Sequence, residues 1–136
     1  MSKFDYLVDS DAFIGRFFPN DAHYHECTKK FAQLESVAAQ LVTTNLVILE
    51  VATVLSHKDS QEAARKFLQV IKQGQLPVIH LDEKLFAKSL ELFAIQTKKG
   101  TSVVDCANVV VMERYKIGKI FSFDEIYTKS FNLQLA

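Results

Sequence analysis

The segment FDYLVDSD (residues 4–11) combines a short apolar run with acids directly after it. Phe4–Val8 is predicted to form a strand that ends at Asp9, and a short helix is expected from Asp11 to Phe17. The Pro19-Asn20-Asp21 stretch is a turn signal. The segment therefore predicts a strand-to-helix unit with carboxylates at the junction.

Strands and helices are expected to alternate along the rest of the chain. Apolar residues recur at steps of three and four in the helical segments, and short apolar runs separate them. Such alternation predicts a three-layer α/β/α fold with a central, mostly parallel sheet, in one domain that spans residues 1–136. The further strands are expected at Gln40–Thr43, Leu76–Leu81 and Lys119–Phe123. The further helices are expected at residues 22–38, Asn45–His57 and Gln61–Gln73. A helix is also expected after the N-cap Asp82, another runs from an N-cap at Thr101 or Ser102 to Tyr115, and a short one lies in the tail.

Composition excludes several classes of protein. Apolar residues make up 49% of the chain, and Lys+Arg and Asp+Glu each total 16, so the formal net charge is zero. A nucleic-acid surface would therefore have to be a local patch. Cys27 and Cys106 lack ligand-like spacing and are expected to be buried thiols in a reducing compartment. With no signal peptide or membrane span expected, the prediction is a cytoplasmic protein.

Two of the acids follow predicted strands. Asp9 ends the first strand and Asp124 follows the strand that contains Ile120–Phe123. In a parallel sheet the carboxyl ends of the strands lie at one edge, where ligands bind. An Asp at this position is also a common helix N-cap, so either acid taken alone has that second interpretation.

Two further acids interrupt apolar helices near their N-termini. Glu50 lies within Val47–Ala52 and Asp105 within Val103–Ala107. Helix N-termini that follow strands gather at the same edge, so four carboxylates are expected to converge. Uncompensated burial of such charges costs several kcal/mol. Because Mg²⁺ and Mn²⁺ prefer oxygen ligands, the pattern indicates metal-assisted phosphodiester hydrolysis.

Four motifs together resemble those of the PIN-domain family. They are YLVDSDAFI (residues 6–14), LEV (49–51), TSVVDCA (101–107) and IFSFD (120–124). Each is weak alone, but their order and spacing cover nearly the whole chain. The size is similar to that of PIN toxins of type II toxin–antitoxin pairs, the VapC-like group.

The resemblance implies an Mg²⁺- or Mn²⁺-dependent endoribonuclease. It implies that Asp9, Glu50, Asp105 and Asp124 are the catalytic, metal-binding residues, holding one or two metals. It also implies a homodimer, an RNA substrate and a cognate antitoxin. Asp11 departs from the pattern because the family commonly has Asn there. It either adds a negative charge at the rim of the site or caps the short helix.

Other residues are lesser candidates. Ser10 and Ser102 either hydrogen-bond the carboxylates or act as helix caps. Asn108 follows Asp105 by one helical turn and either touches substrate or is a solvated polar residue. The chain has 11 Phe and no Trp. Helices that carry Tyr24, Phe31 and Phe67 are therefore expected to leave an apolar patch for self-association.

Two alternatives remain open. A phosphatase of the haloacid dehalogenase type would use Asp9 and Asp11, with Thr43 or Thr44 as the strand-end hydroxyl, but it leaves Glu50 and Asp105 unexplained. A catalytically silent PIN-like binding module would keep the fold without the chemistry. The sequence does not specify the RNA target.

Overall fold

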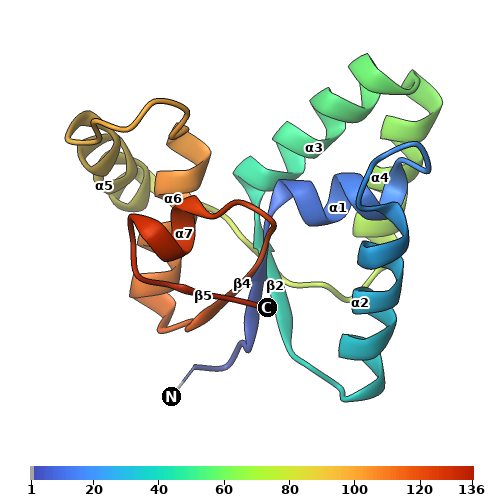
Figure 1. The fold of residues 1–136 in the computed structure, drawn as a ribbon, viewed down its shortest axis with the longest axis horizontal. Coiled ribbons are helices and arrows are strands. Elements are labelled where there is room, and N and C mark those ends of the chain that lie inside the picture. The colour runs from blue at the N-terminus through green and yellow to red at the C-terminus, as the bar shows by residue number, and fades with distance from the viewer. Residues whose placement is uncertain (1) are drawn as a thin grey trace.

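A computed structural model describes residues 2–136, and within them the chain forms one five-stranded sheet (Figure 1). The strand order is β3-β2-β1-β4-β5, and every neighbouring pair is parallel. The predicted parallel sheet is confirmed. The strands are β1 (Tyr6–Val8), β2 (Leu41–Thr44), β3 (Val78–Ile79), β4 (Lys119–Phe121) and β5 (Gln134–Leu135).

Helices cover both faces of this sheet, with α1 to α4 on one side and α5 to α7 on the other (Figure 1). Successive residues of a strand point to opposite faces. Val8 and Phe121 accordingly pack in the core beneath α1 to α4, whereas Leu7 and Ile120 pack beneath α6 and α7. The three-layer α/β/α prediction is confirmed. The helices of residues 2–136 are α1 (Ser10–Phe17), α2 (Tyr24–Ser36), α3 (Asn45–Lys58), α4 (Gln61–Gln73), α5 (Glu83–Ala94), α6 (Val103–Tyr115) and α7 (Ile126–Lys129).

Local capping chemistry sets most helix ends where the sequence predicts them. Asp82 accepts a hydrogen bond from the backbone of Leu85 and caps α5, and Ser102, not Thr101, caps α6. Gly74 is the C-cap of α4. These ends agree because a cap is an interaction between residues a few positions apart.

Strand ends are less well predicted. The expected strand Leu76–Leu81 contains only the two residues of β3, which begins directly after Pro77. β4 stops at Phe121 instead of Phe123. The tail contains β5 as well as the expected short helix. A strand exists only where a neighbouring strand offers hydrogen-bond partners, and residue patterns do not show where that neighbour ends.

Helices α1 and α2 pack closely against each other. A Cβ atom at Gly15 would collide with Sγ of Cys27. Both cysteines are buried and free, as the sequence predicts. This close packing holds α1 in position. The first turn of α1 begins directly after Asp9, at the carboxyl end of β1.

No helix in the described residues 2–136 has the length and hydropathy that crossing a bilayer requires.

Candidate functional site

Asp9 lies at the carboxyl edge of β1 and is the most completely bonded of the predicted acids. Its side chain is only 5% exposed. Oδ1 accepts from the backbone N–H of Ser10 (2.7 Å) and from Nδ2 of Asn108 (3.0 Å). Oδ2 lies within hydrogen-bond distance of the hydroxyls of Ser122 (3.0 Å) and Tyr127 (2.8 Å). Asp9 is thus both the N-cap of α1 and the meeting point of side chains from α6, α7 and the end of β4.

Tyr127 connects Asp9 to Asp105. Its fully buried hydroxyl lies 2.8 Å from Oδ2 of Asp9 and 3.1 Å from Oδ1 of Asp105. Nδ2 of Asn108 donates to the same hydroxyl at 3.1 Å. A phenol has one proton, so at any moment it donates to only one of the two carboxylates. One hydroxyl therefore holds together two acids that would otherwise repel each other.

Asp105 also caps its own helix. Its Oδ2 accepts from the backbone N–H of Ser102 (2.9 Å), and the Ser102 hydroxyl accepts from the backbone N–H of Asp105 (3.0 Å), a reciprocal capping box. Oδ1 remains directed to Tyr127. Of its two expected roles, Ser102 therefore acts as a helix cap. Asp105 takes part in the same capping box and also contacts the acid cluster through Tyr127. The Ser10 hydroxyl is buried and has no hydrogen-bond partner within residues 2–136.

Asp11 and Asp124 meet around a second hydroxyl, that of Ser122. Oδ2 of Asp11 lies 3.0 Å from the Ser122 hydroxyl and accepts from the backbone N–H of Phe123 (2.8 Å). Ser122 Oγ accepts from the backbone N–H of Asp124 (3.1 Å). Asp124 is exposed, and its Oδ1 accepts from the backbone N–H of Ile126. Asp124 thus lies beside Asp11 at the rim, one hydroxyl away from Asp9.

Glu50 is set apart from this network. It is half-buried on α3, in a shallow, largely apolar hollow that Leu49 and Val104 also line. Val104 directly precedes Asp105, so Glu50 faces the N-terminal turn of α6 without the hydrogen bonds that join the other acids. Within residues 2–136, no three His, Cys, Asp or Glu side chains are grouped closely enough to hold a metal ion.

The acid cluster holds negative charge that no ion pair of residues 2–136 neutralises. Burial, followed by the charge of Asp11, raises the pKa of Asp9 to about 7, against the hydrogen bonds from Ser10 and Tyr127 that lower it. Burial also raises the pKa of Asp11. Burial, followed by the charges of Asp9 and Asp105, raises the pKa of Tyr127, which therefore remains a protonated donor. The ion pairs of the described chain, His23–Glu26 and Lys129–Glu125, include none of these acids.

The oxygen atoms of these side chains are of the kind that a hard divalent cation prefers. In this structure the same side chains hydrogen-bond one another. The ligand atoms are oxygens, the central acid is buried, and no basic side chain in the described part of the chain forms an ion pair with it. Oδ1 of Asp11 and Oδ1 of Asn108 are buried and unpartnered within residues 2–136. Asp9 and Asp105 are the residues placed to hold such an ion together.

The threonines required by the phosphatase alternative are already engaged. The Thr43 hydroxyl donates to the carbonyl of Val8 (2.9 Å), and the Thr44 hydroxyl accepts from the backbone of Val47 as the N-cap of α3. Both side chains are fully buried. Their hydroxyls serve to join β1, β2 and α3, so the structure does not favour this alternative.

Two residues of the cluster, Ser122 and Tyr127, were not predicted. Ser122 lies inside the strand expected over Lys119–Phe123, although a polar residue two positions before Asp124 at a strand end is a weak signal of a site. Tyr127 gave no signal, because an aromatic residue in a short tail helix normally indicates core packing.

The fold and site define a small parallel α/β protein with a buried carboxylate cluster at the carboxyl edge of its sheet. The model of the PIN domain matches residues 6–129, nearly the whole chain. The chain therefore belongs to the PIN-domain family.

Solved structures with the same fold include a toxin and, from Klebsiella pneumoniae, a toxin–antitoxin complex. VapC20 of Mycobacterium tuberculosis, a sarcin–ricin loop cleaving toxin, is 20% identical with a TM-score of 0.79, covering 90% of this chain and 92% of that one. FitAcB of Neisseria gonorrhoeae is 10% identical (TM-score 0.65, 96% and 95% covered). VapBC2 of Rickettsia felis, bound to a promoter DNA fragment, is 14% identical (TM-score 0.63, 96% of each chain). No curated protein sequence matches the chain significantly.

Proposed function

We propose that this protein is a metal-dependent endoribonuclease that uses Mg²⁺ or Mn²⁺. The observation that carries the proposal is the Asp9–Asp105 pair, which is buried at the sheet edge and forms no ion pair with a basic side chain of residues 2–136. Membership of the PIN-domain family, whose members are nucleases, supports the same reaction. The RNA-cleaving activity of VapC20, a protein of the same fold, favours RNA as the substrate.

In this proposal each acid has a distinct role. Asp9 and Asp105 would hold the cation directly. Asp124 and Glu50 would join from the rim and from α3, and Asp11 would add negative charge beside them. A bound cation would lower the pKa of a water and stabilise charge on the scissile phosphate. The donors Asn108, Ser122 and Tyr127 keep the carboxylates oriented.

RNA cleavage by the purified protein should require a divalent cation. We expect a panel of single-stranded and structured RNAs to be cleaved with Mg²⁺ or Mn²⁺ and not with EDTA. The same cations should raise the melting temperature without any RNA, since a ligand at 100 times its Kd stabilises by about 2.7 kcal/mol. Undiminished cleavage in excess chelator would rule out the metal site.

We further propose that the chain is the toxin of a toxin–antitoxin pair and acts on RNA in the cytoplasm. A toxin–antitoxin complex from Klebsiella pneumoniae has this fold, which supports an antitoxin partner here. The test is to co-express the product of the adjacent reading frame. If that product neither binds this chain nor stops RNA cleavage, the pairing is wrong.

A homodimer is proposed through α5, not through the aromatic helices considered in the sequence. Phe67 is fully buried and packs against Phe13 and Phe17, so it offers no surface. On α5, Phe86 (47% exposed), Leu90 (42%) and Phe93 (39%) recur at helical spacing and form an apolar stripe. Such a stripe favours burial against a second copy.

Charge placed in the α5 stripe should separate the subunits. We expect wild type to be a dimer by light scattering and Leu90→Lys to raise the dimer dissociation constant at least about tenfold, the effect of losing an interface anchor. Val37→Lys, an exposed apolar position at the end of α2, is the matched control and should remain dimeric. A strictly monomeric wild type at high concentration contradicts the proposal.

A further inference from the structure

A second hollow includes Ser122 in its lining. It has a volume of about 330 Å³ and is lined by Glu26 and Lys30 of α2, by Ser122 and Phe123, and by Leu135 of β5. The Ser122 hydroxyl that lines it also bonds Asp9 and Asp11. Because one residue separates the hollow from the acids, a molecule in the hollow would lie next to a phosphate positioned at the acids.

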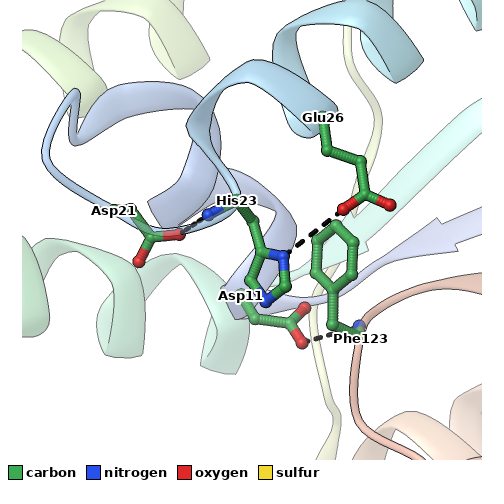
Figure 2. Close-up of polar contacts among 5 residues, drawn as sticks. All are labelled: Asp11, Asp21, His23, Glu26 and Phe123. Carbon is green, nitrogen blue, oxygen red and sulfur yellow. Dashed lines mark hydrogen bonds and ion pairs between the residues drawn. The ribbon is translucent and has the colours of Figure 1, made fainter.

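One wall of this hollow is an aromatic ring held in place before any ligand arrives. The Phe123 ring stacks on His23 with centroids 3.9 Å apart and planes at 6° (Figure 2). The backbone N–H of His23 donates to Asp21 (2.9 Å), and its Nδ1 lies 3.4 Å from Oε2 of Glu26. The backbone N–H of Phe123 donates to Asp11 (Figure 2). Phe123 is therefore held through its ring by the stack on His23 and through its backbone N–H by Asp11 of the acid cluster.

A hydrogen-bonding pair completes the hollow. Glu26 and Lys30 are four residues apart on α2, so they lie one above the other on one helix face. Glu26 is an acceptor, and Lys30 is a donor. Glu125 also lines the hollow and is paired with Lys129, so the hollow has no excess of positive charge that would favour an anionic phosphate.

A nucleobase has the chemistry that this hollow matches. Unpaired bases of RNA are splayed out, stacked on aromatic side chains and recognised by hydrogen bonds along their edges. We propose that the hollow is a subsite for one unpaired nucleobase next to the scissile phosphate of an RNA substrate. This inference rests on the proposed function, because it places the base next to a phosphate that the acids would cleave. Phe123 provides the stacking surface, and Glu26 and Lys30 read the base edge.

The test maps the cleavage site and then replaces each flanking nucleotide in turn with an abasic one. In wild type, one abasic position should raise KM about tenfold, the usual effect of losing one base stack. In Phe123→Leu this penalty should disappear, because the stacking surface is gone. In Glu26→Gln, an exposed change that tests base reading without altering the core, the preferred base at that position should change. Tyr115→Leu, at an exposed aromatic residue at the end of α6, is the matched control and should keep the wild-type penalty.

The possible outcomes separate the subsite from the nuclease proposal. If wild type cleaves RNA but every abasic position behaves alike, or if Phe123→Leu keeps the penalty while melting like wild type, the subsite is wrong and the nuclease stands. If wild type cleaves no RNA, binding of a fluorescein-labelled unstructured RNA in EDTA decides. Tighter binding by wild type than by Phe123→Leu and Glu26→Gln supports the base subsite, and equal binding overturns it.

Discussion

Asp9→Asn should reduce RNA cleavage by about a thousandfold and make the metal-free protein more stable above pH 7. The first effect follows because a metal ligand contributes several kcal/mol of charge stabilisation to the transition state, and each 1.36 kcal/mol is tenfold in rate. The second follows because the substitution removes a buried charge while keeping the shape of the side chain. Asn Oδ1 can still accept from Ser10 and Asn108, and the hydroxyls of Ser122 and Tyr127 can rotate to suit an amide.

The stability gain should depend on pH in a defined direction. The pKa of Asp9 rises on folding from its ordinary value of 3.8 to about 7, so the folded state binds this proton more tightly than the unfolded state does. The favourable contribution of Asp9 is complete below about pH 4 and is lost as the pH rises through about 7. The difference between a pKa of 3.8 and one of about 7 sets an upper limit of about 4 kcal/mol for this loss. The variant avoids the loss, so its advantage should be largest above pH 7 and vanish near pH 4.

Thermal melts of both metal-free proteins across pH 4–8, with one cleavage assay, would check this prediction. Asp82→Asn is the matched control, because Asp82 is an exposed N-cap aspartate whose carboxylate accepts from the backbone N–H of Leu85 and from no residue of the cluster. Asn caps a helix about as well as Asp does, so this control should melt and cleave like wild type. An Asp9→Asn protein that cleaves RNA normally, or whose stability follows wild type at every pH, would refute the proposed site.

Tyr127→Phe should destabilise the metal-free protein by about 2 kcal/mol and weaken Mn²⁺ binding by about tenfold or more. The variant deletes one hydroxyl that serves Asp9, Asp105 and Asn108, and it leaves buried polar atoms without a partner. We expect weaker metal binding because the two carboxylates lose the donor that holds them side by side. Loss of a group that orients metal ligands typically reduces affinity or activity 10–100-fold.

Calorimetric titration with Mn²⁺, together with melting curves in EDTA, would measure both effects. Tyr115→Phe is the matched control, since Tyr115 is 40% exposed at the end of α6 and away from the acids. The change in unfolding free energy of the double variant Tyr127→Phe, Asp9→Asn should differ from the sum of the two single changes, because the residues share a hydrogen bond. Unchanged Mn²⁺ affinity in a folded Tyr127→Phe protein would show that the hydroxyl does not position the metal ligands.

Much of the fold could be predicted because the information lies within short stretches of sequence. The periodicity of Gln61–Gln73 reproduces α4 residue for residue, and the caps Asp82 and Ser102 mark the starts of α5 and α6. Once strands alternate with helices, a parallel sheet follows, and its geometry brings strand-end acids to a common edge. Asp9, Asp11 and Asp124 do lie at that edge.

Only the tertiary structure decided how the acids are connected. The Tyr127 hydroxyl reaches Asp9 across 118 positions of sequence, and Asn108 reaches it across 99. Such contacts depend on the exact packing of α6 and α7 against the sheet, which residue patterns do not specify. The same packing leaves Glu50 apart from the acids that it was expected to join.

The sequence by itself therefore determined the elements, their order and the edge at which the acids gather. These follow from backbone preferences and apolar periodicity among near neighbours in the chain. The tertiary structure alone determined that Asp9 and Asp105 share a phenol and that Ser122 divides the acids from the hollow beside Phe123. The physical reason is that hydrogen bonds act over about 3 Å, a precision set only when elements far apart in the sequence have packed together.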